Sequence, residues 1–147
     1  MMFVDGGHSA AGLLYIDNAV DGIVAAANAA STNGLVYNLR DGSNETWREY
    51  VNALATGMKL PPVRKSISSR LALGVARVSE AVYGGLRVKS RPLLTRHAVY
   101  LMSRDQAYGI ERARQDLSFT PSVDFETGVA ACLRWLESDE GRACIQA

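Results

Sequence analysis

The sequence is poor in the residues that build disulfide frameworks and metal centres. Among its 147 residues are only two cysteines, Cys132 and Cys144, and they form no paired-cysteine motif. This indicates neither a disulfide framework nor a zinc ribbon. The two histidines, His8 and His97, lack the clustered cysteines, histidines or carboxylates that a metal ion needs. We therefore expect no metal site.

Long hydrophobic runs are also missing. The longest stretch without a charged residue, residues 22–39, carries several asparagine, serine and threonine side chains, so it is too polar and too short to cross a bilayer. The first residues show no basic region followed by an apolar core, which is the pattern of a secretory signal. The sequence therefore predicts a cytoplasmic protein.

The common nucleotide-binding and nucleophile motifs are absent. No G-x-G-x-x-G turn lies between a strand and a helix, no G-x-x-x-x-G-K phosphate loop occurs, and no G-x-S-x-G elbow occurs. In tyrosine–lysine chemistry, the lysine lowers the pKa of a tyrosine that exchanges a proton with the carbinol oxygen. None of the six tyrosines is followed by a lysine four positions later. The motifs therefore predict no catalytic residue and no cofactor-binding residue.

Charge is balanced overall but not along the chain. The net charge is +1, yet residues 59–104 hold ten basic residues against one acidic residue, while the segments on either side are each acidic by four charges. Such a basic segment can pair with acidic flanks, bind anions or face a membrane. Nucleic-acid binding is not expected, because no recognised binding module accompanies the charge.

Hydrophobic periodicity predicts a mostly helical α/β chain with a few short strands. Strands are expected at residues 2–4, 13–16 and 35–39, and extended pieces at 63–67 and 106–109. Helices are expected at about 17–33 (ended by Asn33-Gly34), 46–56, 68–83, 95–102, 110–117 and 124–136. Thr46 and Glu49 have capping-box spacing, and Asp124 is a further N-cap. Residues 138–147 are expected to be a frayed tail.

Five ordered segments resemble one known family. They are L-Y-I-D-N-A-V-D-G-I at 14–23, G-L-V-Y-N-L-R-D-G at 34–42, T-W-R-E-Y at 46–50, the stretch R-D-Q-A-Y to L-S-F-T-P at 104–121, and F-E-T-G to W-L at 125–136. In this order they resemble the extended short-chain dehydrogenases/reductases. The sequences of these segments are most similar to the NAD(P)-dependent epimerase/dehydratase group and its 3β-hydroxysteroid dehydrogenase-like branch. Gly12 and Leu13 stand where nucleotide-sugar members usually have an arginine.

The resemblance implies an α/β fold in which residues 1–137 form the C-terminal, substrate-binding portion of an extended Rossmann-type fold, followed by a tail at 138–147. The Rossmann half, with its glycine fingerprint and its Tyr-x-x-x-Lys pair, is absent from these residues. In the intact family the cofactor is NAD or NADP, and none is expected for this chain alone. The expected partners are a small-molecule substrate and either a missing N-terminal half or a second copy of the chain, because unpaired strand edges invite association.

The resemblance also implies a reaction at a hydroxyl or keto group of an apolar, sterol-like substrate. We expect the pocket wall on the 68–83 helix and the 91–104 stretch, with Arg96, His97, Tyr100 and Arg104 as polar substrate-binding residues. The apolar stripe Leu71, Val75, Val78 and Val82 is then either pocket wall or core. We expect the chain to be inactive alone, so the sequence leaves open whether it is itself an enzyme.

A second hypothesis remains beside this one. The basic 59–104 segment and its apolar helix can instead make the chain a non-enzymatic module that contacts a membrane surface or a partner protein. Each Lys or Arg near an anionic membrane surface contributes about 1 kcal/mol, so several on one face would give measurable binding.

Overall fold

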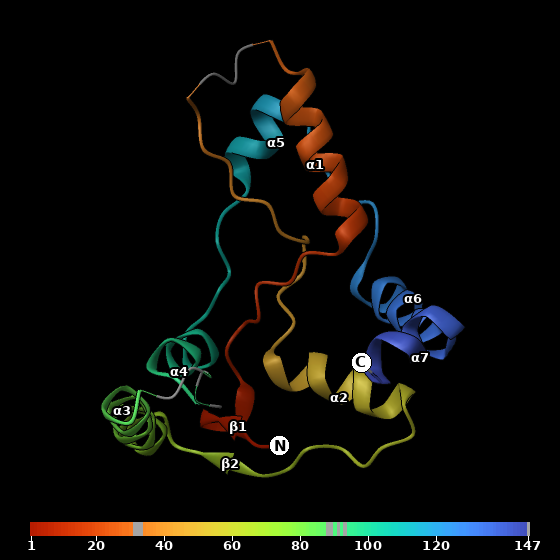
Figure 1. Ribbon diagram of the computed structural model, residues 1–147. Helices are drawn as coiled ribbons and strands as arrows, with labels where there is room; N and C mark the ends of the chain where they lie inside the picture. Colours follow the sequence, from red (N-terminus) through yellow and green to blue (C-terminus); the bar gives the residue numbers. More distant parts are fainter. Residues whose placement is uncertain (31–33, 88–89, 91, 93, 147) are drawn as a thin grey trace.

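The computed structural model describes residues 1–30, 34–87, 90, 92 and 94–146, and Figure 1 shows its arrangement. Two short strands and a 3-10 turn accompany the helices among these residues. The strands are β1 (Phe3–Val4) and β2 (Ser66–Ile67), and the turn η1 is Asp5–Gly7. The helices are α1 (Ile16–Asn28), α2 (Trp47–Gly57), α3 (Ser69–Gly85), α4 (Arg96–Ser103), α5 (Glu111–Leu117), α6 (Phe125–Glu137) and α7 (Asp139–Gln146).

The lower part of the molecule is built around a two-stranded parallel sheet. β1 pairs with β2 in the register Phe3 to Ser66 and Val4 to Ile67, which joins segments about sixty residues apart. Helices α3 and α4 pack together beside this sheet (Figure 1). Their contact buries a small cluster of side chains, Val4, Ala72, Ala76 and Val99. This arrangement is a mostly helical α/β structure, as the sequence predicted.

The upper part of the molecule holds α1 and α5, and extended segments connect it to the lower part (Figure 1). Its buried cluster is Ile110, Ala113, Leu117 and Phe119, against which residues of α1 and of the 37–39 segment pack. One polar junction fixes α1 to its neighbours. The fully buried Asn18 donates to the Asp41 Oδ1 atom (2.6 Å) and to the Val123 carbonyl (2.8 Å), while its own Oδ1 accepts from the backbone of Ser122 and Val123.

Two helices begin directly after the capping residues that the sequence predicted. The capping box at α2 is confirmed: the Glu49 N–H donates to the Thr46 hydroxyl, and the Thr46 N–H donates to the Glu49 carboxylate. Asp124 caps α6 through the Thr127 N–H at 2.8 Å. Such caps satisfy N–H groups that have no partner inside the helix, so polar residues at these positions fix where each helix begins.

Two of the expected strands are wrong. Residues 13–15 are extended and Ile16 already begins α1, while the 35–39 segment is extended without forming a strand. Both segments have the apolar alternation of strands, but a strand also needs a neighbour that shares its hydrogen bonds. The Asp41 N–H donates to the Leu13 carbonyl at 2.9 Å, but this single backbone bond between the two segments does not make a ladder. The first helix also ends earlier than expected, because α1 stops at Asn28. Asn33, where the end was expected, lies outside the described residues.

The expected frayed tail is also wrong, because residues 139–146 form α7. Its first turn is stabilised by Ser138, whose hydroxyl accepts from the Gly141 N–H at 3.1 Å. Asp139 and Glu140 follow in that turn, where acidic side chains interact favourably with the helix dipole. Within the described residues, no helix has both the length and the apolar character needed to cross a bilayer.

The apolar stripe of the third helix is not part of the core, and its role as a pocket wall stays a prediction. Leu71, Val75, Val78 and Val82 are 47% to 66% exposed, whereas Ala72 and Ala76 on another face of α3 are fully buried. Alanines lie at the contact because α3 and α4 approach closely there. The larger side chains of the stripe therefore remain on the surface.

Candidate functional site

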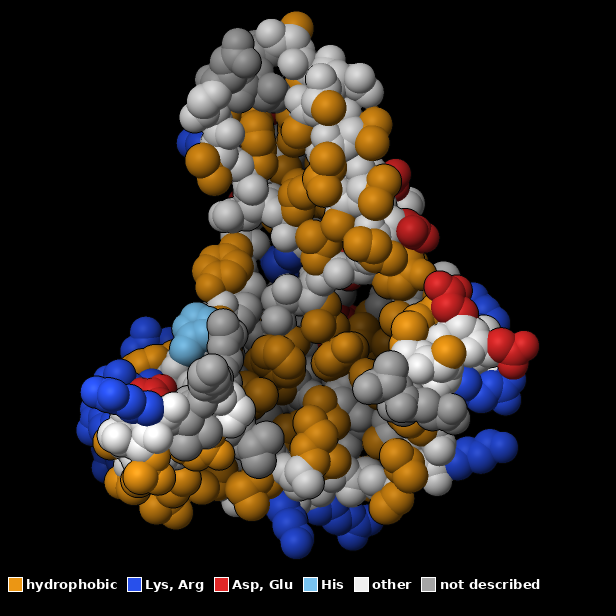
Figure 2. Space-filling model, in the orientation of Figure 1, with side chains coloured by type: hydrophobic (Ala, Val, Ile, Leu, Met, Phe, Trp, Pro, Cys, Tyr) orange, Lys and Arg blue, Asp and Glu red, His pale blue; other side chains and the backbone are white. Residues whose placement is uncertain are grey.

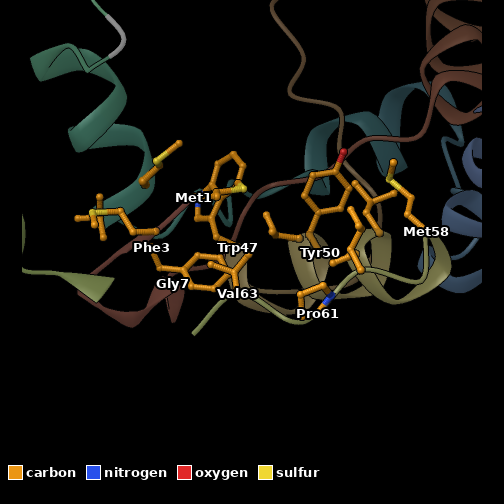
Figure 3. A pocket seen from close by; sticks show the side chains of 15 residues that line it. Met1, Phe3, Gly7, Trp47, Tyr50, Met58, Pro61 and Val63 are labelled. Carbon is orange, nitrogen blue, oxygen red and sulfur yellow. The ribbon is translucent and has the colours of Figure 1, made fainter. Parts of the chain in front are cut away.

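An apolar cavity of about 450 Å³ lies beside β1 in the lower part of the molecule. Its walls come from the N-terminal strand, from α2, from the segment after α2 and from α4 (Figure 3). None of the lining side chains is charged. The lining residues are Met1, Met2, Phe3, Val4, Gly7, Trp47, Tyr50, Val51, Leu54, Ala55, Met58, Leu60, Pro61, Val63 and Met102.

Helix α2 provides the longest wall. Positions 47, 50, 51, 54, 55 and 58 all line the cavity, and this spacing places them on one face of a helix. The capping box at Thr46 fixes the start of α2 and therefore fixes which side chains point inward. None of the residues of α2 is fully buried in the folded chain. Its apolar face is therefore available to a ligand rather than used in the core.

The turn after β1 closes one side of the cavity. Gly7 has a φ of +69°, and a Cβ at this position would lie 2.7 Å from the Phe3 ring. The Arg48 Nε atom donates to the Gly6 carbonyl at 2.7 Å, and the same guanidinium lies 4.9 Å from the centroid of the Phe3 ring. Arg48 thus joins the start of α2 to η1 and holds the Phe3 side of the cavity in place.

The lining side chains are suited to binding rather than to proton transfer. The cavity has no carboxylate, imidazole or amine side chain, and the phenol of Tyr50 is the one ionisable side chain in it. The Tyr50 hydroxyl adds a polar atom to an otherwise apolar wall, whereas the Trp47 Nε1 atom is buried without a hydrogen-bond partner. A hydrophobic molecule would therefore lose its water shell here while meeting few polar groups.

A second, smaller cavity of about 180 Å³ lies between α2, α6 and residues 13–16. Its two carboxylates already have structural partners. Asp41 accepts from the Tyr15 N–H at 2.9 Å as well as from Asn18. The Thr127 backbone N–H that Asp124 caps lowers the pKa of the Asp124 carboxyl. Neither carboxylate is therefore a free acid or base.

The four predicted substrate-binding residues lie on α4 and at its end, outside both cavities. The Arg96 Nε atom pairs with the Glu80 carboxylate at 2.6 Å, and His97 is exposed. The Arg104 guanidinium lies 5.1 Å from the Tyr100 ring centroid, so these two are brought together. Their role in substrate binding stays a prediction. Arg91, where the expected wall stretch begins, is outside the described residues.

The walls of the larger cavity differ from those expected. No residue of α3 lines it, and Met102 is the contribution of α4. The capping residues in the sequence located the start of α2, but no functional role was expected for this helix. The missed signal was the complete apolar stripe of α2, from Trp47 to Met58, which is visible at helical spacing in the sequence.

Glu80 has an electrostatic role between two helices. The backbone N–H of Arg96 and then its guanidinium lower the pKa of the Glu80 carboxyl. The carboxylate lies on α3 and the arginine starts α4, so the pair links the two helices near their exposed sides. Within the described part of the chain, no three histidine, cysteine or acidic side chains form a metal-ligand set.

The glycines Gly6 and Gly7 do not form the phosphate-binding turn of a dinucleotide fold. The glycines after β1 lie within η1, which is followed by an extended segment and not by a helix whose first N–H groups could hold a pyrophosphate. The space beside Gly6 and Gly7 is taken by the side chains of His8 and Phe3. The cavity, in turn, has no cation for a phosphate.

Comparisons with known proteins place the chain near reductases. It is 32% identical over 119 residues to the 2-alkyl-3-oxoalkanoate reductase of Stenotrophomonas maltophilia, an alignment that covers 78% of this chain and 36% of that protein. It is 26% identical over 129 residues to the 4-hydroxy-2-methyl-3-oxo-4-farnesyl-3,4-dihydroquinoline-1-oxide ketoreductase of Stigmatella aurantiaca, covering 88% of this chain and 38% of that protein. The uncharacterized protein YbjS of Escherichia coli is 26% identical over 140 residues, which are 93% of this chain and 41% of YbjS.

The structural comparison shows a similar fold in one solved structure. The crystal structure of gox2253 superimposes with a TM-score of 0.62 and 17% identity, over 86% of this chain and 37% of that one. No family model matches the sequence. The chain spans only 36% to 41% of the length of the relatives given above. In sequence, it is related to part of a group of oxidoreductases that includes named ketoreductases.

Proposed function

We propose that this chain is the substrate-binding part of an NAD(P)-dependent oxidoreductase that acts on a keto or hydroxyl group of an apolar compound. The observation that carries the proposal is the 450 Å³ cavity with its uncharged wall of fifteen residues. A cavity of this size is within the range of small-molecule sites, and its walls favour an apolar ligand.

The names of the relatives support the same substrate class. One relative is named for a 2-alkyl-3-oxoalkanoate and another for a farnesylated quinoline with a keto group. Both names describe a carbonyl attached to an apolar body. We extend this class to the present chain, with a long alkyl chain and a sterol-like ring system as the two shapes that the cavity could accept.

No helix directly follows Gly6 and Gly7 to hold a pyrophosphate, and this supports assigning to the chain the binding of substrate only. A Rossmann half outside residues 1–137 would hold NAD or NADP and carry the proton-transfer pair. The chain by itself is then inactive. Its contribution is to remove water from the apolar body of the substrate and to fix where the carbonyl lies.

Tryptophan fluorescence can test ligand binding directly. The chain has two tryptophans: Trp47 lines the cavity, and Trp135 is 44% exposed on α6. In a Trp135→Phe background, titration with a long-chain methyl ketone or with a ketosteroid should give a saturable change in Trp47 emission. The shape that binds more tightly identifies the substrate class.

A matched pair of cavity variants makes the test specific. Val51→Phe fills the larger cavity, whereas Val129→Phe fills the smaller cavity only. We expect the first to weaken binding at least tenfold and the second to leave it unchanged. If neither ligand gives a saturable signal, or if both variants behave alike, the larger cavity is not a substrate site.

A further inference from the structure

The exposed apolar stripe of α3 continues to the residue after the helix. Leu71, Val75, Val78, Val82 and Leu86 recur at helical spacing and are 47% to 72% exposed. Soluble monomers rarely leave such a continuous apolar surface in water. Figure 2 shows the hydrophobic side chains that gather over the lower edge of the α3 region.

Basic side chains surround this stripe. Arg70 and Arg77 lie on α3 itself, two turns apart, and Arg87 follows the helix. Arg64 and Lys65 come just before β2, and all five of these side chains are exposed. None of them is within ion-pair distance of a carboxylate among the described residues. The one acidic residue of the 59–104 segment, Glu80, is already paired with Arg96.

Helix α1 has a comparable apolar face with the opposite charge. Val20, Ile23 and Val24 are 50% to 63% exposed on α1, but the exposed charges beside them are the acidic Asp17 and Asp21. An anionic surface would repel this face and attract that of α3. The apolar faces of α1 and α3 are therefore similar in exposure but differ in the sign of the charges beside them.

We propose that α3 is a docking helix for the surface of an anionic lipid bilayer. The stripe from Leu71 to Leu86 would lie among the acyl chains near the headgroups, with the helix in the plane of the surface. Arg70 and Arg77 are long enough to keep their guanidinium groups at the phosphates while their methylene stems lie along the apolar boundary. A basic amphipathic helix of this kind lies on a membrane without crossing it.

The proposal goes beyond substrate binding and does not depend on it. A neighbouring face of α3 serves as the anchor, since Ala72 and Ala76 hold the helix against the fold through α4 and β1. It is also compatible with the non-enzymatic hypothesis for the basic 59–104 segment. In either case, the partner is a lipid surface rather than a protein.

Vesicle co-sedimentation of the full chain tests the proposal. We expect binding to vesicles of equimolar phosphatidylcholine and phosphatidylserine, weak binding to phosphatidylcholine alone, and weaker binding as salt is raised. Arg70→Gln and Arg77→Gln should each reduce affinity about fivefold, which corresponds to roughly 1 kcal/mol per charge near the surface. Val78→Ser should reduce it on the order of tenfold, because it removes apolar area from the stripe.

The matched control is Ile23→Ser on α1. Ile23 is 63% exposed and Val78 is 66% exposed, so both changes remove a surface aliphatic side chain from a helix. Only Val78→Ser should weaken vesicle binding, while circular dichroism should show that both variants keep the helical content of the parent chain.

Three results would overturn the proposal. The first is equal binding to charged and uncharged vesicles, and the second is an equal loss in both serine variants. The third is a chain that does not bind vesicles but sediments as a dimer, together with a Val78→Ser variant that sediments as a monomer. That last result would identify the stripe as an interface between two copies of the chain.

Discussion

The buried junction at Asn18 allows a quantitative test of what holds α1 in place. We consider the change Asn18→Ala. The Asn18 side chain is fully buried and takes part in hydrogen bonds of 2.6 to 3.0 Å with Asp41, Ser122 and Val123. Alanine keeps the helix but removes every one of these bonds. Asp41 is only 5% exposed, and its carboxylate would lose the hydrogen bond that the Asn18 amide donates to Oδ1.

The expected loss is about 3 kcal/mol of unfolding free energy. Leaving a buried donor or acceptor without a partner costs roughly 1–3 kcal/mol per group, and more for a charged one. Ser122 and Val123 are only partly buried, so water can replace some of their lost bonds, and the estimate stays well below the sum of all the groups. For a chain of this length, a loss of that size lowers the melting temperature by about 10 °C.

Urea denaturation followed by circular dichroism gives the measurement. The matched control is Asn44→Ala, since Asn44 also accepts a hydrogen bond, from the Arg40 Nη1 atom, but is exposed. Its cost should stay within about 0.5 kcal/mol. If the two alanine variants differ by less than about 1 kcal/mol, repacking or water satisfies the junction, and the reasoning from buried partners is wrong.

A second substitution separates charge from hydrogen-bond loss at the same position. Asn18→Asp keeps the acceptors for the 122–123 backbone but faces the Asp41 carboxylate with a second carboxylate. Two like charges raise the pKa of the pair in the folded state above its unfolded value. Stability is therefore regained as the pH falls through that raised value, and it is regained to a smaller extent in Asn18→Ala, which removes a hydrogen bond from the Asp41 carboxylate but adds no second charge.

Three further predictions concern the helix contacts and the glycines. The pKa of the Glu80 carboxyl lies below its ordinary value of 4.5 in the folded chain. The stabilisation that the ionised Glu80 gives is therefore present above pH 4.5 and is lost as the pH falls through the lowered pKa. An NMR titration of Glu80 should show the lowered pKa, and Arg96→Gln should move that pKa upward. Gly7→Ala should lower stability by about 1–3 kcal/mol in thermal unfolding, because of the positive φ and because its Cβ would meet the Phe3 ring at 2.7 Å. Gly74→Ala should instead raise stability by about 0.5–1 kcal/mol, since the space beside this helical position is open; a loss would show that the α3 surface is packed against something.

The local signals in the sequence predicted the helices well. Thr46, Ser68, Thr95 and Asp124 each cap a helix at or next to the expected position, because a cap depends only on residues within one turn. The same kind of signal was present at Ser138 and was missed. Local chemistry is therefore enough to find where most of these helices begin.

Strands and the cavity depend on distant residues, and the sequence predicted them less well. Residues 35–39 alternate like a strand, but whether they form one depends on a neighbour that no described segment provides. The third helix had the clearest apolar stripe, and this favoured it as the pocket wall over α2. The alanines at 72 and 76 allow close helix contact, so they, not the large side chains, turned out to define the buried face of α3.

The two buried clusters have no residue in common, which has a consequence for how the chain opens. Val4, Ala72, Ala76 and Val99 form one cluster, and the Ile110 to Phe119 cluster forms the other. Each is small, and extended backbone connects them, so each region can unfold locally without the other. Amide hydrogen exchange should then show two separate levels of protection. A ligand in the cavity beside β1 would slow exchange in β1 and α2 while leaving α1 and α5 at their original rates.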